Sequence, residues 1–169
     1  EVQTSGGNIS TGSIEGKAEL QTSGGDIVTG DIRGDLSLNT SGGNIHVGVV
    51  TGIADVSTLG GDIIIDRVDK SLAAATSGGN VRIGDVGDDA SITTSGGDIV
   101  LDHVRGNASM STAGGNIILT SARGVVRAST AGGDIRADSI MGWIVAKTAA
   151  GNIDVMLIPS GAGKSKLST

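Results

Sequence analysis

A threonine returns every eighteen residues along this chain, and the spacing holds without a slip from Thr4 to Thr148. Each threonine opens a short run of small residues that ends in Asn or Asp, as in Thr-Ser-Gly-Gly-Asp-Ile at 22–27. Repetition of one short unit predicts a solenoid, because such a unit buries its apolar face only by stacking on its neighbours. We therefore expect a single domain over residues 1–169. Its nine repeats start at Thr4, Thr22, Thr40, Thr58, Thr76, Thr94, Thr112, Thr130 and Thr148.

Within each repeat, apolar residues recur at steps of two. If the threonine is position zero, aliphatic side chains occupy positions five, seven, ten, fourteen and sixteen. Steps of two are typical of β-strands, so each coil should hold two short strands. The Gly-Gly turn joins them at one end, and a corner near positions ten to twelve joins them at the other. The expected fold is all-β, a parallel β-solenoid of nine eighteen-residue coils. A coil rise of about 4.8 Å would give a rod of about 43 Å, and we expect right-handed winding.

The composition suits a thin aliphatic interior. Trp143 is the only aromatic residue, cysteine is absent, and 30 of the 169 residues are glycine. Most glycines fall at the turn and the corner, although Lys70, Asp88 and Ser160 interrupt the corner pattern. We expect the Gly-Gly turn to need positive φ angles, which glycine adopts without steric cost. Because the last coil has Ala150-Gly151, the second glycine should be the stricter requirement.

The charge of the chain limits its partners. Twelve basic residues against eighteen acidic residues leave a net charge of −6, which disfavours nucleic acid and anionic membranes as partners. No apolar run is long enough to predict a membrane span. The first residues already belong to the repeat, so we expect either a removed leader or a segment of a longer protein.

The residue after the glycine pair alternates strictly between Asn and Asp. We interpret the alternation as a structural ladder, since an amide between two carboxylates separates the like charges to about 9.6 Å and can donate hydrogen bonds to them. Descent from a duplicated unit of 36 residues is an alternative explanation. The ladder residues are Asn8, Asp26, Asn44, Asp62, Asn80, Asp98, Asn116, Asp134 and Asn152.

Calcium binding is the other hypothesis for these turns. Three of the four coils with Asp carry a second acid four residues later, in the pairs Asp62/Asp66, Asp98/Asp102 and Asp134/Asp138. Calcium requires six to eight oxygen ligands, and the calcium-binding β-roll has a third glycine in its motif that is missing here. We therefore expect no metal site and no cofactor.

The sequence predicts no catalytic residue. His46 and His103 fall in different coils, no cysteine is present, and the serines recur with the repeat. Gly161-Ala-Gly-Lys-Ser165 resembles a phosphate loop, but it lacks the earlier glycine and the strand–loop–helix context, so we expect an ordinary loop. The threonines share parity with the inward positions, which argues against an exposed ice-binding plane.

The recurring Thr-Ser-Gly-Gly-Asp-Ile and Thr-Ser-Gly-Gly-Asn-Ile motifs, with Ala/Leu-x-Leu/Val-x-Thr upstream, resemble the DUF4097 family of bacterial and archaeal adhesin-like proteins. The resemblance covers essentially the whole chain. It implies a β-solenoid at the cell surface or outside the cell, and it supplies no catalytic residues. The departures are Leu59, Ala113, Ala131 and Ala149, which replace the serine.

The ends of the chain give a further expectation. Ser165-Lys-Leu-Ser-Thr169 resembles Ala108-Ser-Met-Ser-Thr112 but is displaced by three residues, which predicts a tenth, irregular coil. We recognise no cap, so we expect either a fragment or open ends that meet head to tail. Outward apolar residues could also form a lateral contact. They are Val28, Ile64, Val100 and Ile118.

These observations favour a non-enzymatic structural or adhesive element outside the cytoplasm. Its expected partners are copies of itself or components of the cell surface and matrix. A subunit of a head-to-tail extracellular filament is one alternative. A carbohydrate-active enzyme built on a β-helix is the other, and it would require acids that converge in a cleft.

Overall fold

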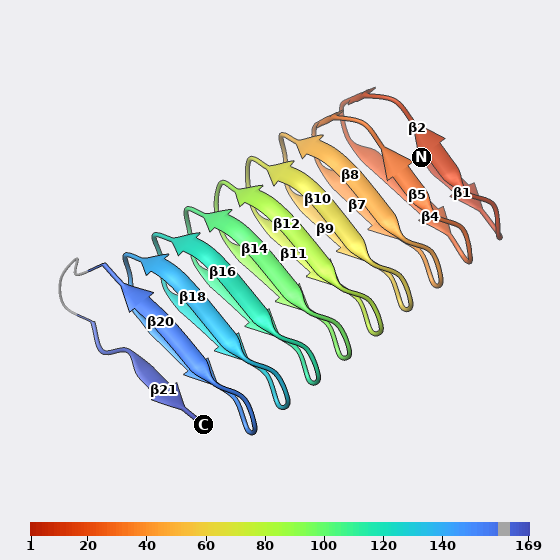
Figure 1. Ribbon diagram of the computed structural model, residues 1–169. Helices are drawn as coiled ribbons and strands as arrows, with labels where there is room; N and C mark the ends of the chain where they lie inside the picture. The colour runs from red at the N-terminus through yellow and green to blue at the C-terminus, as the bar shows by residue number, and fades with distance from the viewer. Residues whose placement is uncertain (159–162) are drawn as a thin grey trace.

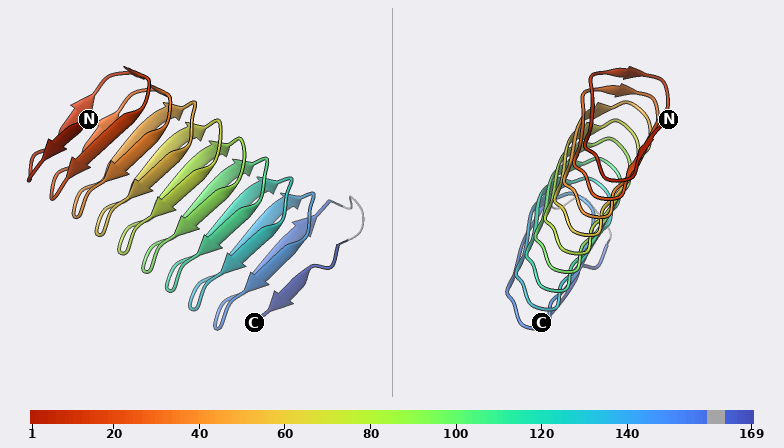
Figure 2. Two further views of the ribbon diagram at one scale, coloured as in Figure 1. Left: turned by 180° about the vertical axis from the view of Figure 1, so that it is seen from behind. Right: turned by 90° about the vertical axis from the view of Figure 1, so that its right-hand side faces the viewer.

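The computed structural model describes residues 1–158 and 163–169, and it shows a parallel β-solenoid of about nine turns. The coils stack along one axis with the two termini at opposite ends of the rod, and the outline of each coil is flattened (Figures 1 and 2). The predicted fold class is therefore confirmed, while the right-handed winding stays a prediction. Ser160 and the first two residues of the loop at 161–165 lie outside the described residues.

Two parallel sheets form the broad faces of the rod. The first sheet has ten strands in the order β1 (Val2–Thr4), β4 (Ala18–Thr22), β7 (Leu36–Asn39), β9 (Ala54–Ser57), β11 (Leu72–Ala75), β13 (Ala90–Thr93), β15 (Ala108–Ser111), β17 (Val126–Ser129), β19 (Ile144–Lys147) and β21 (Lys166–Ser168). The second sheet has eleven strands. Its main path is β2 (Ile9–Thr11), β5 (Ile27–Thr29), β8 (Ile45–Val50), β10 (Ile63–Val68), β12 (Val81–Val86), β14 (Ile99–Val104), β16 (Ile117–Ala122), β18 (Ile135–Ile140) and β20 (Ile153–Leu157), and the short strands β3 (Ile14–Glu15) and β6 (Ile32–Arg33) lie beside it.

The strands pair in the register that the repeat predicts. Ile63 of β10 lies opposite Ile45 of β8 on one side and Val81 of β12 on the other, so equivalent residues stack eighteen positions apart. A register of this kind stacks like side chains in columns along the rod. Each coil therefore contributes one residue to every column.

The core consists of the five predicted apolar columns. Ile99 and Leu101 at positions five and seven, Val104 at position ten, and Ala108 and Met110 at positions fourteen and sixteen are all at most 2% exposed. Burying a full-size aliphatic side chain contributes about 1.5–3 kcal/mol relative to exposure. Among the described residues every buried apolar side chain is aliphatic or methionine, as the composition predicts.

The first two coils differ from the rest on the second sheet. Their strand is interrupted after position seven, so β2 and β3 are separate, as are β5 and β6. From β8 to β18 the two pieces join in one strand that runs to position ten. Thr29 takes the place of an aliphatic residue in this region, and its buried hydroxyl group has no hydrogen-bond partner.

The last coil is irregular, as predicted. Val145 of β19 lies opposite Lys166 of β21, so this step spans twenty-one residues instead of eighteen. Gly163, in the segment before β21, lies so near Trp143 that a Cβ on it would come 2.9 Å from the indole ring, and the backbone N–H of Ile144 donates to Ser165 Oγ at 3.2 Å. In β20, Leu157 and not Ile158 lies opposite Ile140.

Among the described residues, no helical segment has the length and hydropathy needed to cross a bilayer.

Candidate functional site

The Asn and Asp residues of the turn form a continuous ladder of hydrogen bonds along the rod. At every step, the side-chain Oδ1 of one coil accepts the backbone N–H of the equivalent residue in the next coil. Asp98 N donates to Asn80 Oδ1 at 2.9 Å, and Asn116 N donates to Asp98 Oδ1 at 2.6 Å. Bonds to a carboxylate measure 2.6–2.7 Å and bonds to an amide 2.8–2.9 Å along the whole ladder. This difference is expected for charge-assisted hydrogen bonds.

The amide side chains give the alternation a physical role. Asn80, Asn116 and Asn152 each donate through Nδ2 to the Asp carboxylate of the preceding coil at 3.2–3.4 Å. A carboxylate in the same place would accept only and would repel its neighbours. The alternation therefore gives each of these carboxylates two donors from the following coil.

The repeating threonine links adjacent coils through a contact that the sequence did not predict. Thr94 is 3% exposed, which confirms that the threonine column points inward. Its Oγ1 donates to the carbonyl oxygen of Gly79 in the preceding turn at 2.9 Å and accepts the N–H of Gly97 at 3.3 Å. The same pair of bonds recurs in every coil from Thr22 to Thr148. Both partners are backbone groups, so only the strict repetition of threonine hinted at the contact.

The expected reason for the glycine pair is wrong. Among the described glycines only Gly16 has a positive φ, at 101°, and it lies at a corner. The second glycine of the turn is required because adjacent turns approach each other closely. A Cβ on Gly97 would overlap the carbonyl oxygen of Gly79 in the preceding coil. The first glycine is less constrained, since a Cβ on Gly42 would lie 3.6 Å from its nearest neighbour, and so the second glycine is the stricter one, as predicted.

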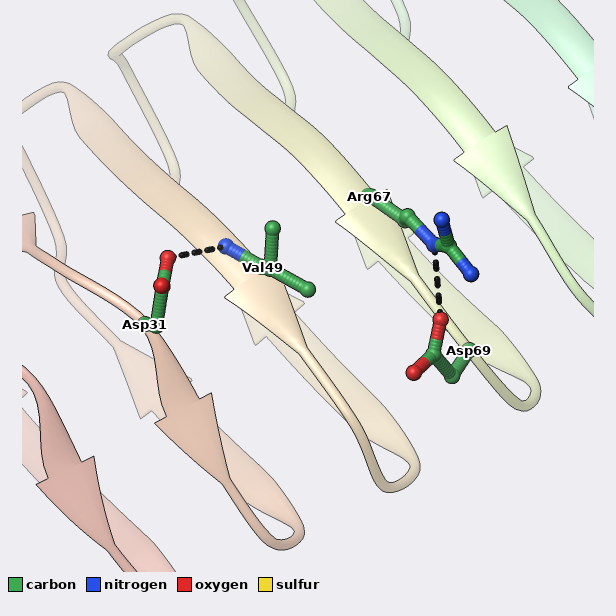
Figure 3. A network of polar contacts seen from close by, with 4 residues as sticks. All are labelled: Asp31, Val49, Arg67 and Asp69. Atoms are coloured by element: carbon green, nitrogen blue, oxygen red, sulfur yellow. Dashed lines mark hydrogen bonds and ion pairs between the residues drawn. The ribbon is translucent and has the colours of Figure 1, made fainter.

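The opposite corner of the coil is held by contacts that vary along the rod. Asp31 Oδ1 accepts the N–H of Val49 at 3.1 Å, and Arg67 Nε donates to Asp69 within one coil at 2.7 Å (Figure 3). Other coils use Asp89 Oδ1, which accepts the N–H of Asn107 at 2.7 Å. The contacts that hold this corner therefore differ from coil to coil.

A depression of about 490 Å³ lies at this corner, across four successive coils. Positions nine and eleven of those coils supply most of its lining. Three arginines and two aspartates carry its charge, in contrast to the acidic chain as a whole, and one histidine lies among them. These residues are Arg67, Asp69, Asp85, His103, Arg105 and Arg123. Sequence reasoning missed this cluster, because its members are spread over 57 residues of chain. They come together only because equivalent positions of successive coils stack on one another.

The other candidate residues stay apart. His46 lies in β8 and His103 in β14, with β10 and β12 between them in the sheet. In residues 1–158 and 163–169, no three His, Cys, Asp or Glu side chains lie close enough together to hold a metal ion. The second acids of the calcium hypothesis, such as Asp102, lie on the strands of the second sheet and not in the turns.

Comparisons with known proteins add no relative. No protein-family model, no curated protein and no solved structure matches this chain. The β-solenoid fold therefore stands on the structure itself, and membership of the DUF4097 family stays a prediction from the repeat motif.

Proposed function

We propose that this chain is a structural or adhesive rod that acts outside the cytoplasm, associates with itself and has no enzymatic activity. The observation that carries the proposal is that the residues that recur in every coil serve to join neighbouring coils. The aliphatic columns, the buried threonines, the second glycines and the Asn/Asp ladder all hold one coil to the next. A scaffold of this kind provides long regular faces whose length grows with the number of coils.

The outward faces support a role in contact with surfaces. On the first sheet, the exposed residues of the central strands are small, as with Ala73, Ala75, Ser91 and Thr93. Small side chains leave a smooth face along which an extended partner or another rod can lie. The place outside the cytoplasm is supported by the resemblance of the repeat to the DUF4097 motif.

The adhesive role is tested with beads coated with the folded chain. We expect these beads to be retained on the surface or matrix of the source cells, and beads coated with the heat-unfolded chain to wash off. An antibody against the chain should label intact cells from outside. Equal retention of the two kinds of bead, or labelling only after the cells are opened, would refute the proposal.

The absence of enzymatic activity needs its own assay, because the alternative is a carbohydrate-active β-helix enzyme. In the depression at the corner, Asp69 pairs with Arg67, and Asp85 lies 3.0 Å from His103 Nδ1. Both acids are thus engaged by a basic side chain. We expect no release of reducing ends from polygalacturonate or xylan, and a release that tracks the purified chain would establish the enzyme alternative.

Self-association is supported by exposed apolar side chains on the second sheet. Val28, Ile64 and Ile118 are 47%, 39% and 40% exposed at equivalent positions of their coils. A head-to-tail filament is the alternative geometry, because a coil that pairs in register with a similar coil of its own chain can also pair with one from another copy. Sedimentation velocity and electron microscopy at rising concentration test both. Fibres with an axial repeat of about 4.8 Å indicate the filament, lateral bundles indicate the apolar face, and monodisperse rods would refute self-association.

A further inference from the structure

The depression at the variable corner contains two arginines that are not paired. Of the charged residues there, Arg67 binds Asp69 at 2.7 Å, and His103 Nδ1 lies 3.0 Å from Asp85. Each aspartate thus has a basic partner within the depression. Within the described residues, the guanidinium groups of Arg105 and Arg123 have no ion-pair partner.

These two arginines occupy the same column in adjacent coils. Both stand at position eleven, directly after β14 and β16, and adjacent coils lie about 4.8 Å apart. The first coils show what this geometry permits: Glu15 and Arg33 hold the same position in adjacent coils, and their side chains form an ion pair of 2.6 Å. The column therefore brings side chains of successive coils within contact distance. At Arg105 and Arg123 it brings two like charges together.

The shape of the site comes from Gly87, the next residue of this column toward the N-terminus. A Cβ at Gly87 would overlap the carbonyl oxygen of Asp69, so stacking requires glycine at this point. The missing side chain leaves the two arginines beside an opening that no protein group fills. Ser121 adds a hydroxyl group to the lining beside Arg123.

We propose that Arg105 and Arg123 together bind the carboxylate or sulfate groups of an acidic carbohydrate. A guanidinium group presents a planar fork of donors that fits an oxyanion, and an oxyanion between the two forks removes the repulsion between them. The arginines succeed one another along the rod axis, which suits a linear polymer with repeated charges. Two free arginines are too few for the long basic stripe of a nucleic-acid site, and the chain is acidic.

The site deepens the proposed adhesive role and rests on it for the choice of a carbohydrate as the source of the anion. The test is isothermal titration with four probes: oligogalacturonate, dextran sulfate, uncharged dextran and inorganic phosphate. We expect the two acidic carbohydrates to bind, with an affinity that falls as salt rises. Uncharged dextran should not bind, and phosphate should bind much more weakly. Phosphate binding as tight as that of the acidic carbohydrates would overturn the choice of carbohydrate.

The decisive variant is Arg105→Gln with Arg123→Gln. We expect it to lose affinity for both acidic carbohydrates by about tenfold or more, the scale of losing hydrogen bonds between charged groups. The matched control is Arg33→Gln with Arg82→Gln, which removes the same charge outside the depression and should change affinity by less than about twofold. Circular dichroism checks that both variants fold. An equal loss in the two variants, or no binding by the wild-type chain, would overturn the site.

The outcomes separate this site from the proposed function. If the double variant loses binding to acidic carbohydrates but coated beads of the wild-type chain do not adhere to cells, the site stands and the adhesive role fails. If the beads adhere and the double variant keeps the wild-type affinity for both acidic carbohydrates, the adhesive role stands and the site fails. A third variant, Arg105→Lys with Arg123→Lys, keeps the charge but not the fork, and it should recover only part of the affinity.

Discussion

The two ends of each coil, the turn and the corner, are held to the neighbouring coils by different contacts. At the turn, a buried threonine, a close-packed second glycine and an Asn or Asp repeat in almost every coil. At the corner, one coil uses an aspartate that accepts a backbone N–H, another uses an Arg–Asp pair, and four coils share a depression. The turn is constrained because backbone approaches backbone there. The corner has room for side chains to differ, so specific recognition is more easily placed on it.

The largest expected effect is at the second glycine of the turn. Gly43→Ala places a Cβ against the carbonyl oxygen of Gly25, and that oxygen cannot move without displacing a whole coil. We expect a loss of about 3 kcal/mol in the free energy of unfolding, measured by denaturant titration. The matched control is Gly42→Ala in the same turn, where the nearest atom lies at 3.6 Å. This control should change stability by less than about 1 kcal/mol, and two equal losses would contradict the close-approach explanation.

The buried threonine should give the next largest effect. Thr94→Val keeps the shape but leaves the carbonyl oxygen of Gly79 and the N–H of Gly97 without the hydroxyl group. We expect a loss of about 2 kcal/mol in the free energy of unfolding, because both backbone groups stay away from water. Thr29→Val is the matched control, since the buried Thr29 hydroxyl has no partner. It should stabilise the chain by about 1 kcal/mol, and the same sign in both variants would refute the role of the bonds.

The turn was largely predictable from the sequence, and the depression was not. A strict period of eighteen residues fixes the register, the inward columns and the ladder, because each depends on a residue type that recurs. The functions of Thr94 and Gly97 were not visible, since both act on the backbone of Gly79 in the preceding coil. Arg105 and Arg123 stand in a column where no single residue type recurs in every coil. Their meaning appears only when the strand ends show that position eleven faces the same position of the next coil.

A smaller effect should follow from breaking the alternation at the turn. Asn80→Asp places three carboxylates in succession, about 4.8 Å apart, and removes the donation from Asn80 Nδ2 to Asp62. We expect a loss of about 1 kcal/mol that shrinks in high salt, because exposed like charges are screened. Asp98→Asn keeps the acceptor for the N–H of Asn116 and is the control, with little change expected. If the loss is absent at low salt, descent from a duplicated unit becomes the better explanation of the alternation.

The smallest effects should appear at the corner, where the informative result is whether the free energy of unfolding rises or falls. Removing the unpaired arginines with Arg105→Gln and Arg123→Gln relieves repulsion, so the free energy of unfolding at low salt should rise slightly, by at most about 0.5 kcal/mol. Arg33→Gln breaks the ion pair with Glu15 in the same column and should lower it by a similarly small amount. Both differences should vanish in high salt, because both sites are exposed. Denaturant midpoints at two salt concentrations measure them. A clear loss of stability in the first variant would mean that these arginines hold the coils together, and the corner would then be as structural as the turn.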